Sequence, residues 1–196
     1  EMEEFRNSLR DLYTGQKISV TPLAFIMKAM VNALKTYPNF NTSLDTENGK
    51  VIYKKYFHIG VAVDTPHGLM VPKIRDVDKL GIKEISQQLR TTSKLCKELK
   101  IDKKEFFGGS MTISSLGGIG GVTFFTPIIN PPEVSILGVG KSYDKVTKFE
   151  GQLVTRKILP ISLSYDHRII DGAEAARFSV HLSQSLGKDF AFKLAV

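Results

Sequence analysis

The chain has 196 residues, of which 42% are hydrophobic and 24% are charged, so it can form a sizeable core and is neither disordered nor collagen-like. Its net charge of +7 is spread along the sequence, without the mixture of arginines and aromatic residues typical of a nucleic-acid surface. No apolar run approaches the roughly 20 residues that cross a bilayer, and the single cysteine excludes a disulfide within the chain and favours a reducing compartment.

Two helices are predicted in the first 40 residues. The opening stretch "EMEEFRNSLRDLY" has helical spacing but no start signal, so we expect the chain to be part of a longer protein. The apolar side of this helix holds Met2, Phe5, Leu9 and Leu12. A clearer helix begins after Thr21, a natural N-cap, with Pro22 at its first position, and ends before Pro38. Its apolar stripe consists of Leu23, Ile26, Met27, Met30 and Leu34.

The next segments predict strands followed by a long helix. Residues 51–56 and 58–64 are rich in branched side chains and are expected to be strands, and the turn "TPHG" separates them from a third strand over 69–76. A helix is predicted over 81–100. Its expected buried side consists of Ile82, Ile85, Leu89, Cys96 and Leu99.

The remaining elements define the fold class. Strands are predicted in "SMTISS" and "PPEVSILGVGK", and a hairpin is predicted to turn at Glu150–Gly151. The last helix begins near Gly172 and is expected to turn Ala176, Val180 and Leu186 inward. Strands and helices mix without strict βαβ alternation, which favours an α/β fold of the α+β type: a two-layer sandwich with helices covering one side of a mixed sheet. We expect one domain over residues 1–196.

The segment "SLSYDHRIIDG" carries the strongest candidate for chemistry. His167 follows an alternating strand, at the point where the backbone leaves the sheet. Asp171 comes four positions later, so one tight turn at Gly172 can bring it back toward the histidine. A histidine held in this way can act as a general base; the alternative is a loop histidine followed by an aspartate that caps a helix. No metal is expected, because the other histidines lack ligand spacing.

A serine pair precedes the glycine-rich loop in "GSMTISSLGGIGG". Ser114 and Ser115 end a predicted strand, where a hydroxyl can donate a hydrogen bond to a developing oxyanion. The alternative is two serines that merely end a strand before a turn. A nucleotide-binding loop is disfavoured, because the segment is not a Walker motif and no clear helix opens after it.

Together with "TPIINPPEVSILGVGK", these two motifs resemble the catalytic domain of dihydrolipoyl acyltransferases, the E2 components of 2-oxo acid dehydrogenase complexes. The resemblance runs in order from "ISVTPLAFIMKAMVNAL" to "ARF", over essentially the whole chain. It implies the chloramphenicol acetyltransferase-like fold and a trimer. The stretches "FGGSMTISSLGG" and "LPISLSYDHRIIDGAEAARF" are most similar to the bacterial pyruvate dehydrogenase branch.

The resemblance implies an activity and roles for residues. The activity is transfer of an acetyl group from S-acetyl-dihydrolipoamide, with the lipoyl group carried on a separate domain, to the substrate coenzyme A. His167 matches the motif histidine, Asp171 matches the motif aspartate that organises the turn, and Ser114 matches the oxyanion donor. Ser115 is the alternative donor, because "GGIGGVTFF" is one residue longer than the family's pattern. The sequence does not identify the coenzyme A contacts.

The resemblance also implies an assembly. In this family the histidine of one subunit faces the serine of its neighbour across a trimer interface, and trimers form a 24-subunit cubic core that binds the E1 and E3 components. The family's initial segment, with an arginine that supports the motif aspartate, is not found here, nor are the lipoyl and subunit-binding domains. The bacterial cytoplasm is the expected location, with the mitochondrial matrix as the alternative.

Three further hypotheses stay open at this stage. The first is transfer of another acyl group, succinyl or branched-chain. The second is an acetyltransferase of the same fold with a small-molecule acceptor. The third is a structural core without catalysis, which the presence of His167 disfavours.

Overall fold

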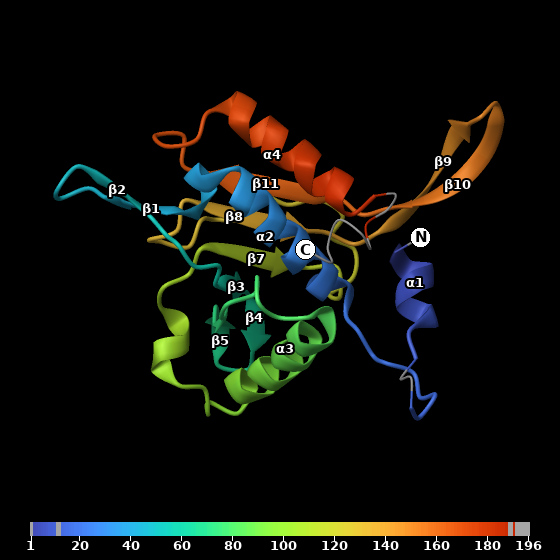
Figure 1. Ribbon diagram of the computed structural model, residues 1–196, viewed down its shortest axis with the longest axis horizontal. Coiled ribbons are helices and arrows are strands. Elements are labelled where there is room, and N and C mark those ends of the chain that lie inside the picture. Colours follow the sequence, from blue (N-terminus) through green and yellow to red (C-terminus); the bar gives the residue numbers. More distant parts are fainter. Residues whose placement is uncertain (1, 11–12, 188–189, 191–196) are drawn as a thin grey trace.

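A five-stranded mixed sheet forms the centre of the molecule (Figure 1). The structure is a computed structural model that describes residues 2–10, 13–187 and 190. The strands lie in the order β11-β8-β7-β3-β6, and β7 pairs in parallel with both β8 and β3, whereas the edge strands β11 and β6 are antiparallel to their neighbours. Their bounds are β3 Ile59–Val61, β6 Lys73–Ile74, β7 Met111–Ser115, β8 Ser135–Val139 and β11 Ile161–Tyr165. The predicted mixed sheet is confirmed.

Helices α2 (Pro22–Thr36) and α4 (Gly172–Ser185) lie side by side over β11, β8 and β7 (Figure 1). Helix α3 (Ile82–Lys97) packs against β4 and β6. The start of α2 is as predicted: the Thr21 hydroxyl accepts the amide hydrogen of Leu23 at 3.0 Å. A short helix, α1 (Met2–Ser8), precedes them. The predicted layer of helices over a mixed sheet is therefore confirmed.

The sheet has one apolar face and one face of small and polar residues. Met111 and Ile113 of β7 are fully buried in the core beneath the helices, so the alternating residues Thr112 and Ser114 point to the opposite face. Phe40 and Phe178 stack within the core with ring centroids 4.0 Å apart. Burial of such a side chain contributes about 1.5–3 kcal/mol.

Three hairpins complete the fold: β1 (Thr42–Asp45) with β2 (Lys50–Tyr53), β4 (Val63–Thr65) with β5 (Gly68–Met70), and β9 (Tyr143–Phe149) with β10 (Gln152–Ile158). The turn of β9–β10 falls at the predicted Glu150–Gly151, and both residues have positive φ, 48° and 84°, as a two-residue hairpin turn of right-handed twist requires. Figure 1 shows β1–β2 and β9–β10 extending away from the body on opposite sides.

The predicted strands 51–56, 58–64 and 69–76 are shorter or divided. The first ends at Tyr53. The second separates into β3 and β4, because β4 leaves the central sheet and pairs with β5. The third separates into β5 and β6 around Pro72, which has no amide hydrogen for a strand ladder.

Two predicted apolar faces are partly wrong. In α4 the buried residues are Ala175, Phe178, Leu182 and Ser185, whereas the predicted Ala176 and Val180 are exposed. The large ring of Phe178 decides the rotation of this helix, because its burial outweighs that of the smaller side chains. Leu99 lies beyond the end of α3, with a φ of 55°, and is 57% exposed. In the first helix, Leu12 lies outside the described residues.

Candidate active site

His167 lies in a turn between β11 and α4, with an exposed side chain. The turn is fixed through its backbone: the amide of Asp166 donates to the carbonyl of Val134 at 2.8 Å, and the amides of Ile169 and Ile170 donate to the carbonyl of Asp166. The ring of His167 is tilted against Tyr165 at 5.8 Å. Its ring nitrogens have no hydrogen-bond partner in the described part of the chain, so a ligand can reach both.

Asp171 is the N-cap of α4. Its carboxylate accepts the amide hydrogen of Glu174 at 2.7 Å, where the negative charge also interacts favourably with the helix dipole. The carboxylate is thus engaged by the helix rather than by His167. This is the arrangement of the capping alternative, and it suits a residue that orders the turn instead of carrying a proton.

The two candidate serines point to opposite faces of the sheet. Ser115 shares the face of Met111 and Ile113, whereas Ser114 shares the face of Thr112. Ser114 is half-buried and Ser115 is exposed. The sequence could not distinguish their surroundings, because the choice depends on which face of β7 meets the helices.

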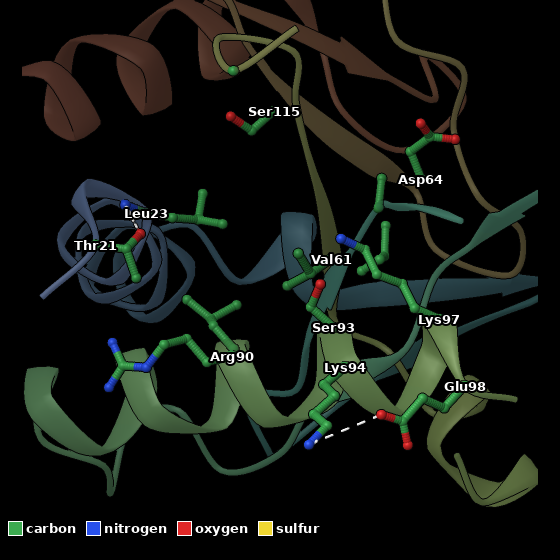
Figure 2. A pocket seen from close by; sticks show the side chains of 14 residues that line it. Thr21, Leu23, Val61, Asp64, Arg90, Ser93, Lys94, Lys97, Glu98 and Ser115 are labelled. Atoms are coloured by element: carbon green, nitrogen blue, oxygen red, sulfur yellow. Dashed lines mark hydrogen bonds and ion pairs between the residues drawn. The ribbon is translucent and has the colours of Figure 1, made fainter. Parts of the chain in front are cut away.

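Ser115 lines a cavity of about 810 Å³ between α2, α3 and the strands β3 and β4 (Figure 2). Apolar side chains of Leu23, Val61 and Leu89 form part of the wall. Helix α3 and its C-cap residue add polar and charged side chains: Arg90, Ser93, Lys94 and Lys97 from the helix, and Glu98 from the cap. His167 is not among the residues that line this cavity. A ligand bound here would contact both an apolar wall and the cationic side of α3.

The serine pair and His167 lie at opposite ends of the sheet within one chain. Ser115 pairs with Val139 of β8, and Val139 pairs in turn with Ile161 at the beginning of β11. His167 comes after Tyr165, at the other end of β11. With about 3.3 Å per residue along a strand and about 4.8 Å between strands, the candidates are roughly 15 to 20 Å apart. A single chain therefore does not bring them together.

A buried ionic cluster was not predicted from the sequence. The Lys73 ammonium lies 2.5 Å from a carboxylate oxygen of Glu133, with side chains only 2% and 1% exposed, and the Thr112 hydroxyl donates to the second oxygen at 2.5 Å. Lys54 lies nearby and donates to the carbonyls of Thr42 and Gly109. Burial is the main cause that lowers the pKa of Lys54 to about 8. Residues so far apart in sequence give no local pattern.

His58, His67 and Cys96 lie outside the set of candidate catalytic residues. His58 stacks on Tyr56, its Nδ1 accepts the amide hydrogen of Asp76 at 3.0 Å, and burial lowers its pKa. His67 is exposed in its turn. Cys96 is buried in α3, and burial raises the pKa of its thiol, as expected of a core cysteine. Of the three, the burial of Cys96 was predicted from the sequence. His58, predicted to begin the strand over 58–64, lies just before β3 and outside it.

Among residues 2–10, 13–187 and 190, no three histidine, cysteine, aspartate or glutamate side chains gather as metal ligands. In the same described residues, no helix has the length and apolar character needed to cross a membrane.

The sequence matches known proteins over nearly its full length. A family model described as 2-oxoacid dehydrogenases acyltransferase (catalytic domain) matches residues 1–191. The dihydrolipoyllysine-residue acetyltransferase component of the pyruvate dehydrogenase complex of Cupriavidus necator is 53% identical over 186 residues, which is 95% of this chain and 33% of that protein. The chain thus spans about a third of the length of this relative.

Solved structures match as well. The dihydrolipoamide acetyltransferase of Azotobacter vinelandii has a TM-score of 0.90 and 42% identity, covering 98% of this chain and 79% of that one. The cubic core of a pyruvate dehydrogenase multienzyme complex has a TM-score of 0.90 and 41% identity, covering 100% and 79%. Chloramphenicol acetyltransferase, at 16% identity and a TM-score of 0.53 over 84% and 77%, shares the fold.

Work on the Azotobacter vinelandii protein addresses the role of a serine, a histidine and an asparagine in its catalytic mechanism. The asparagine lies four positions after the histidine. The same spacing separates His167 from Asp171 in this chain. Asparagine and aspartate are both favoured helix N-caps, so the residue type differs while the capping capacity is shared.

Proposed function

The chain belongs to the family of 2-oxoacid dehydrogenase acyltransferase catalytic domains, and from this premise we propose that it transfers an acetyl group from S-acetyl-dihydrolipoamide to coenzyme A. The observation that carries the proposal is the position of His167, whose unengaged ring projects from a turn with a fixed backbone. The similarity to acetyltransferase components over 95% of the chain supports the choice of acyl group. Residues 1–196 would form one catalytic domain of a longer protein.

His167 acts in this proposal as the general base. A thiol has a pKa of about 8.5, so most of the coenzyme A thiol is protonated at neutral pH. A ring nitrogen of His167 takes the thiol proton as the sulfur attacks the thioester carbonyl, and the carbonyl oxygen becomes an oxyanion. When the carbon–sulfur bond to dihydrolipoamide breaks, the same nitrogen returns the proton to the departing sulfur. General-base catalysis of this kind contributes roughly 10²–10⁴-fold.

Two further residues support the transfer. Ser114 is assigned as the donor to the oxyanion, with Ser115 as the alternative. Asp171 holds the turn through its bond to the α4 amide of Glu174 and does not carry the proton. No covalent intermediate with the protein is needed, because the attacking thiol accepts the acetyl group directly.

Each active site would be shared between two chains. The separation of roughly 15 to 20 Å between Ser114 and His167, estimated from strand geometry, cannot be bridged by one hydrogen bond. A homotrimer, in which His167 of each subunit faces the serine of a neighbour, resolves this separation. The similarity to the cubic core of a pyruvate dehydrogenase complex supports further assembly into a 24-subunit core. The partners would then be the lipoyl domain and the E1 and E3 components, in the bacterial cytoplasm.

The test is acetyl transfer between acetyl-CoA and dihydrolipoamide by an assembled sample. We expect His167→Ala to lower kcat by at least about 10²-fold, because the general base is lost. The matched control is His67→Ala, which removes an exposed histidine from the turn between β4 and β5 and leaves kcat unchanged. An assembled wild-type sample without acetyl transfer would contradict the proposal. Succinyl and branched-chain donors, assayed in parallel, identify the preferred acyl group.

A further inference from the structure

We propose that the buried Lys73–Glu133 ion pair is a positioning device for the catalytic turn of His167. Neither residue is expected to touch a substrate, because their side chains are 2% and 1% exposed. The proposal rests on the acetyl-transfer function only in that the turn carries the general base. The structural part of the proposal can be measured without any substrate.

The ion pair is part of a constructed cluster rather than a chance contact. Glu133 accepts from Lys73 through one oxygen and from the Thr112 hydroxyl through the other. A Cβ on Gly60 would press against the Thr112 hydroxyl and the Lys73 ammonium, and a Cβ on Gly109 would press against Glu133. The two glycines thus leave the space that the cluster occupies. A buried pair with all its partners in place has little freedom to shift.

Glu133 of the cluster is adjacent in sequence to the residue whose carbonyl holds the His167 turn. Glu133 is followed by Val134, whose carbonyl accepts the amide hydrogen of Asp166 at 2.8 Å. Asp166 in turn precedes His167 and accepts the amides that close the turn. Fixing the Glu133 side chain therefore fixes the backbone that carries Asp166, and through it the position of His167.

The cluster also reaches the strand of the candidate serine. Thr112 lies two positions before Ser114 on the same face of β7. Lys73 comes from β6, at the edge of the sheet farthest from β11. The ion pair thus joins three separate segments: β6, β7 and the loop that enters β8. An apolar group in place of either charge could fill the space but could not pull these segments into one fixed arrangement.

A role in positioning differs from a role in stability alone. Removing one partner of a buried ion pair is strongly destabilising, because the other charge stays buried without a partner. Replacing a buried ion pair by well-packed apolar residues of similar volume is often neutral for stability. The double variant Lys73→Met/Glu133→Leu therefore separates the two roles, since it roughly keeps the volume and removes both charges.

The experiment compares the full assembled protein with Glu133→Gln, with the double variant, and with the control Glu105→Gln. The control breaks the half-exposed Arg75–Glu105 pair, which makes no hydrogen bond to the His167 turn within the part of the chain that the structure describes. Hydrogen exchange is measured at the Asp166 amide relative to the core amides of Ile113 and Leu137. We expect exchange at Asp166 to be about tenfold faster in both cluster variants and unchanged in the control.

Kinetics supply the second measurement. Because a misplacement of about 1 Å can lower a rate by up to about 10²-fold, we expect kcat to fall about tenfold or more in both cluster variants, with KM changed less than about twofold. A double variant of wild-type stability that also keeps wild-type kcat and Asp166 protection overturns the proposal and leaves the pair a structural role. Faster exchange at Asp166 in a protein that transfers no acetyl group supports the positioning role and contradicts only the proposed reaction.

Discussion

At the scale of single residues, His167 combines a fixed backbone with an unengaged ring. The neighbouring Asp166 is engaged elsewhere, because its carboxylate is held by the guanidinium of Arg168 at 2.6 Å. Hydrogen bonds from Arg168 lower the pKa of this carboxyl, so it stays ionised at neutral pH. His167 is therefore the ionisable side chain of this turn whose ring nitrogens are not engaged by a neighbour in the described part of the chain.

The serine pair gives the first prediction. We expect Ser114→Ala to lower kcat by about 10²–10³-fold, because one hydrogen-bond donor to the oxyanion is lost. Ser115→Ala is the matched control, since it removes the neighbouring hydroxyl from the opposite face of β7. The measurement is kcat for acetyl transfer by both variants. A larger loss in Ser115→Ala would assign the oxyanion donor to the serine that lines the cavity.

Lys54 gives a prediction on pH. Its pKa is lowered from 10.5 to about 8 in the folded protein, chiefly by burial. As the pH rises above about 8, the folded chain loses this proton before the unfolded chain does, so the unfolded state binds more protons and the free energy of unfolding rises with pH. We expect this contribution to be absent from Lys54→Met. Urea unfolding of both proteins between pH 7 and 10 tests it, and parallel curves would contradict it.

At the scale of elements, the start of α4 links helix stability to the candidate site. Asp171 caps the helix four residues after His167. The side-chain amide of Asn39 donates to both carboxylate oxygens of Glu174, in the first turn of the helix, at 3.2 and 3.0 Å. The Tyr53 hydroxyl donates to the same asparagine at 2.8 Å. The helix start, and with it the end of the His167 turn, is therefore fixed by residues from two other segments.

The cap gives the third prediction. Asp171→Ala should lower the free energy of unfolding by about 1 kcal/mol, because one α4 amide loses its acceptor. It should also lower kcat, because the turn before α4 loosens. Asp171→Asn keeps a good capping side chain and should retain most of both properties. Urea unfolding and acetyl transfer measure the two effects.

Asp102→Ala is the control for this experiment. Asp102 caps the short 3-10 helix Lys103–Phe106 by accepting the Lys104 amide hydrogen at 2.9 Å, away from the turn of His167. It should lower stability without lowering kcat. Equal kcat values for Asp171→Ala and Asp102→Ala would mean that the α4 cap has no part in positioning the site.

At the scale of the whole molecule, the exposed apolar residues suit an assembled protein. The extended hairpin β9–β10 exposes Val146 at 62%, Phe149 at 49% and Leu153 at 78%. The opposite hairpin β1–β2 exposes Ile52 and Tyr53, at 52% and 50%. Exposed apolar side chains gathered on projecting hairpins are typical of contact surfaces between chains. They agree with a site that one chain leaves incomplete.

Subunit mixing gives the fourth prediction. His167→Ala and Ser114→Ala subunits are each expected to be nearly inactive when assembled alone. After joint unfolding and reassembly at equal amounts, about a quarter of the sites in randomly mixed trimers should combine an intact histidine with an intact serine from a neighbour. We expect acetyl transfer to recover to about that fraction. A mixture as inactive as its components, with mixed trimers demonstrated, would place the whole site within one chain.

Local sequence patterns predicted the elements that depend on short-range chemistry. Thr21 and Pro22 begin α2, the Glu150–Gly151 turn closes its hairpin, and the serine pair ends β7 at Ser115 as expected, because caps, turns and alternation act between residues close in sequence. The position of His167 just after a strand was predicted on the same basis. The motifs and their order were also sufficient to suggest the family.

The tertiary structure alone decided how the elements face one another. Val180 is exposed because the ring of Phe178 stacks on Phe40, from a segment more than a hundred residues away in the sequence. The Lys73–Glu133 pair, 60 positions apart, follows from the order of strands in the sheet. The separation of the serine from His167 follows from the directions of β7 and β11. These relations arise from contacts distant in sequence, for which a local pattern contains no information.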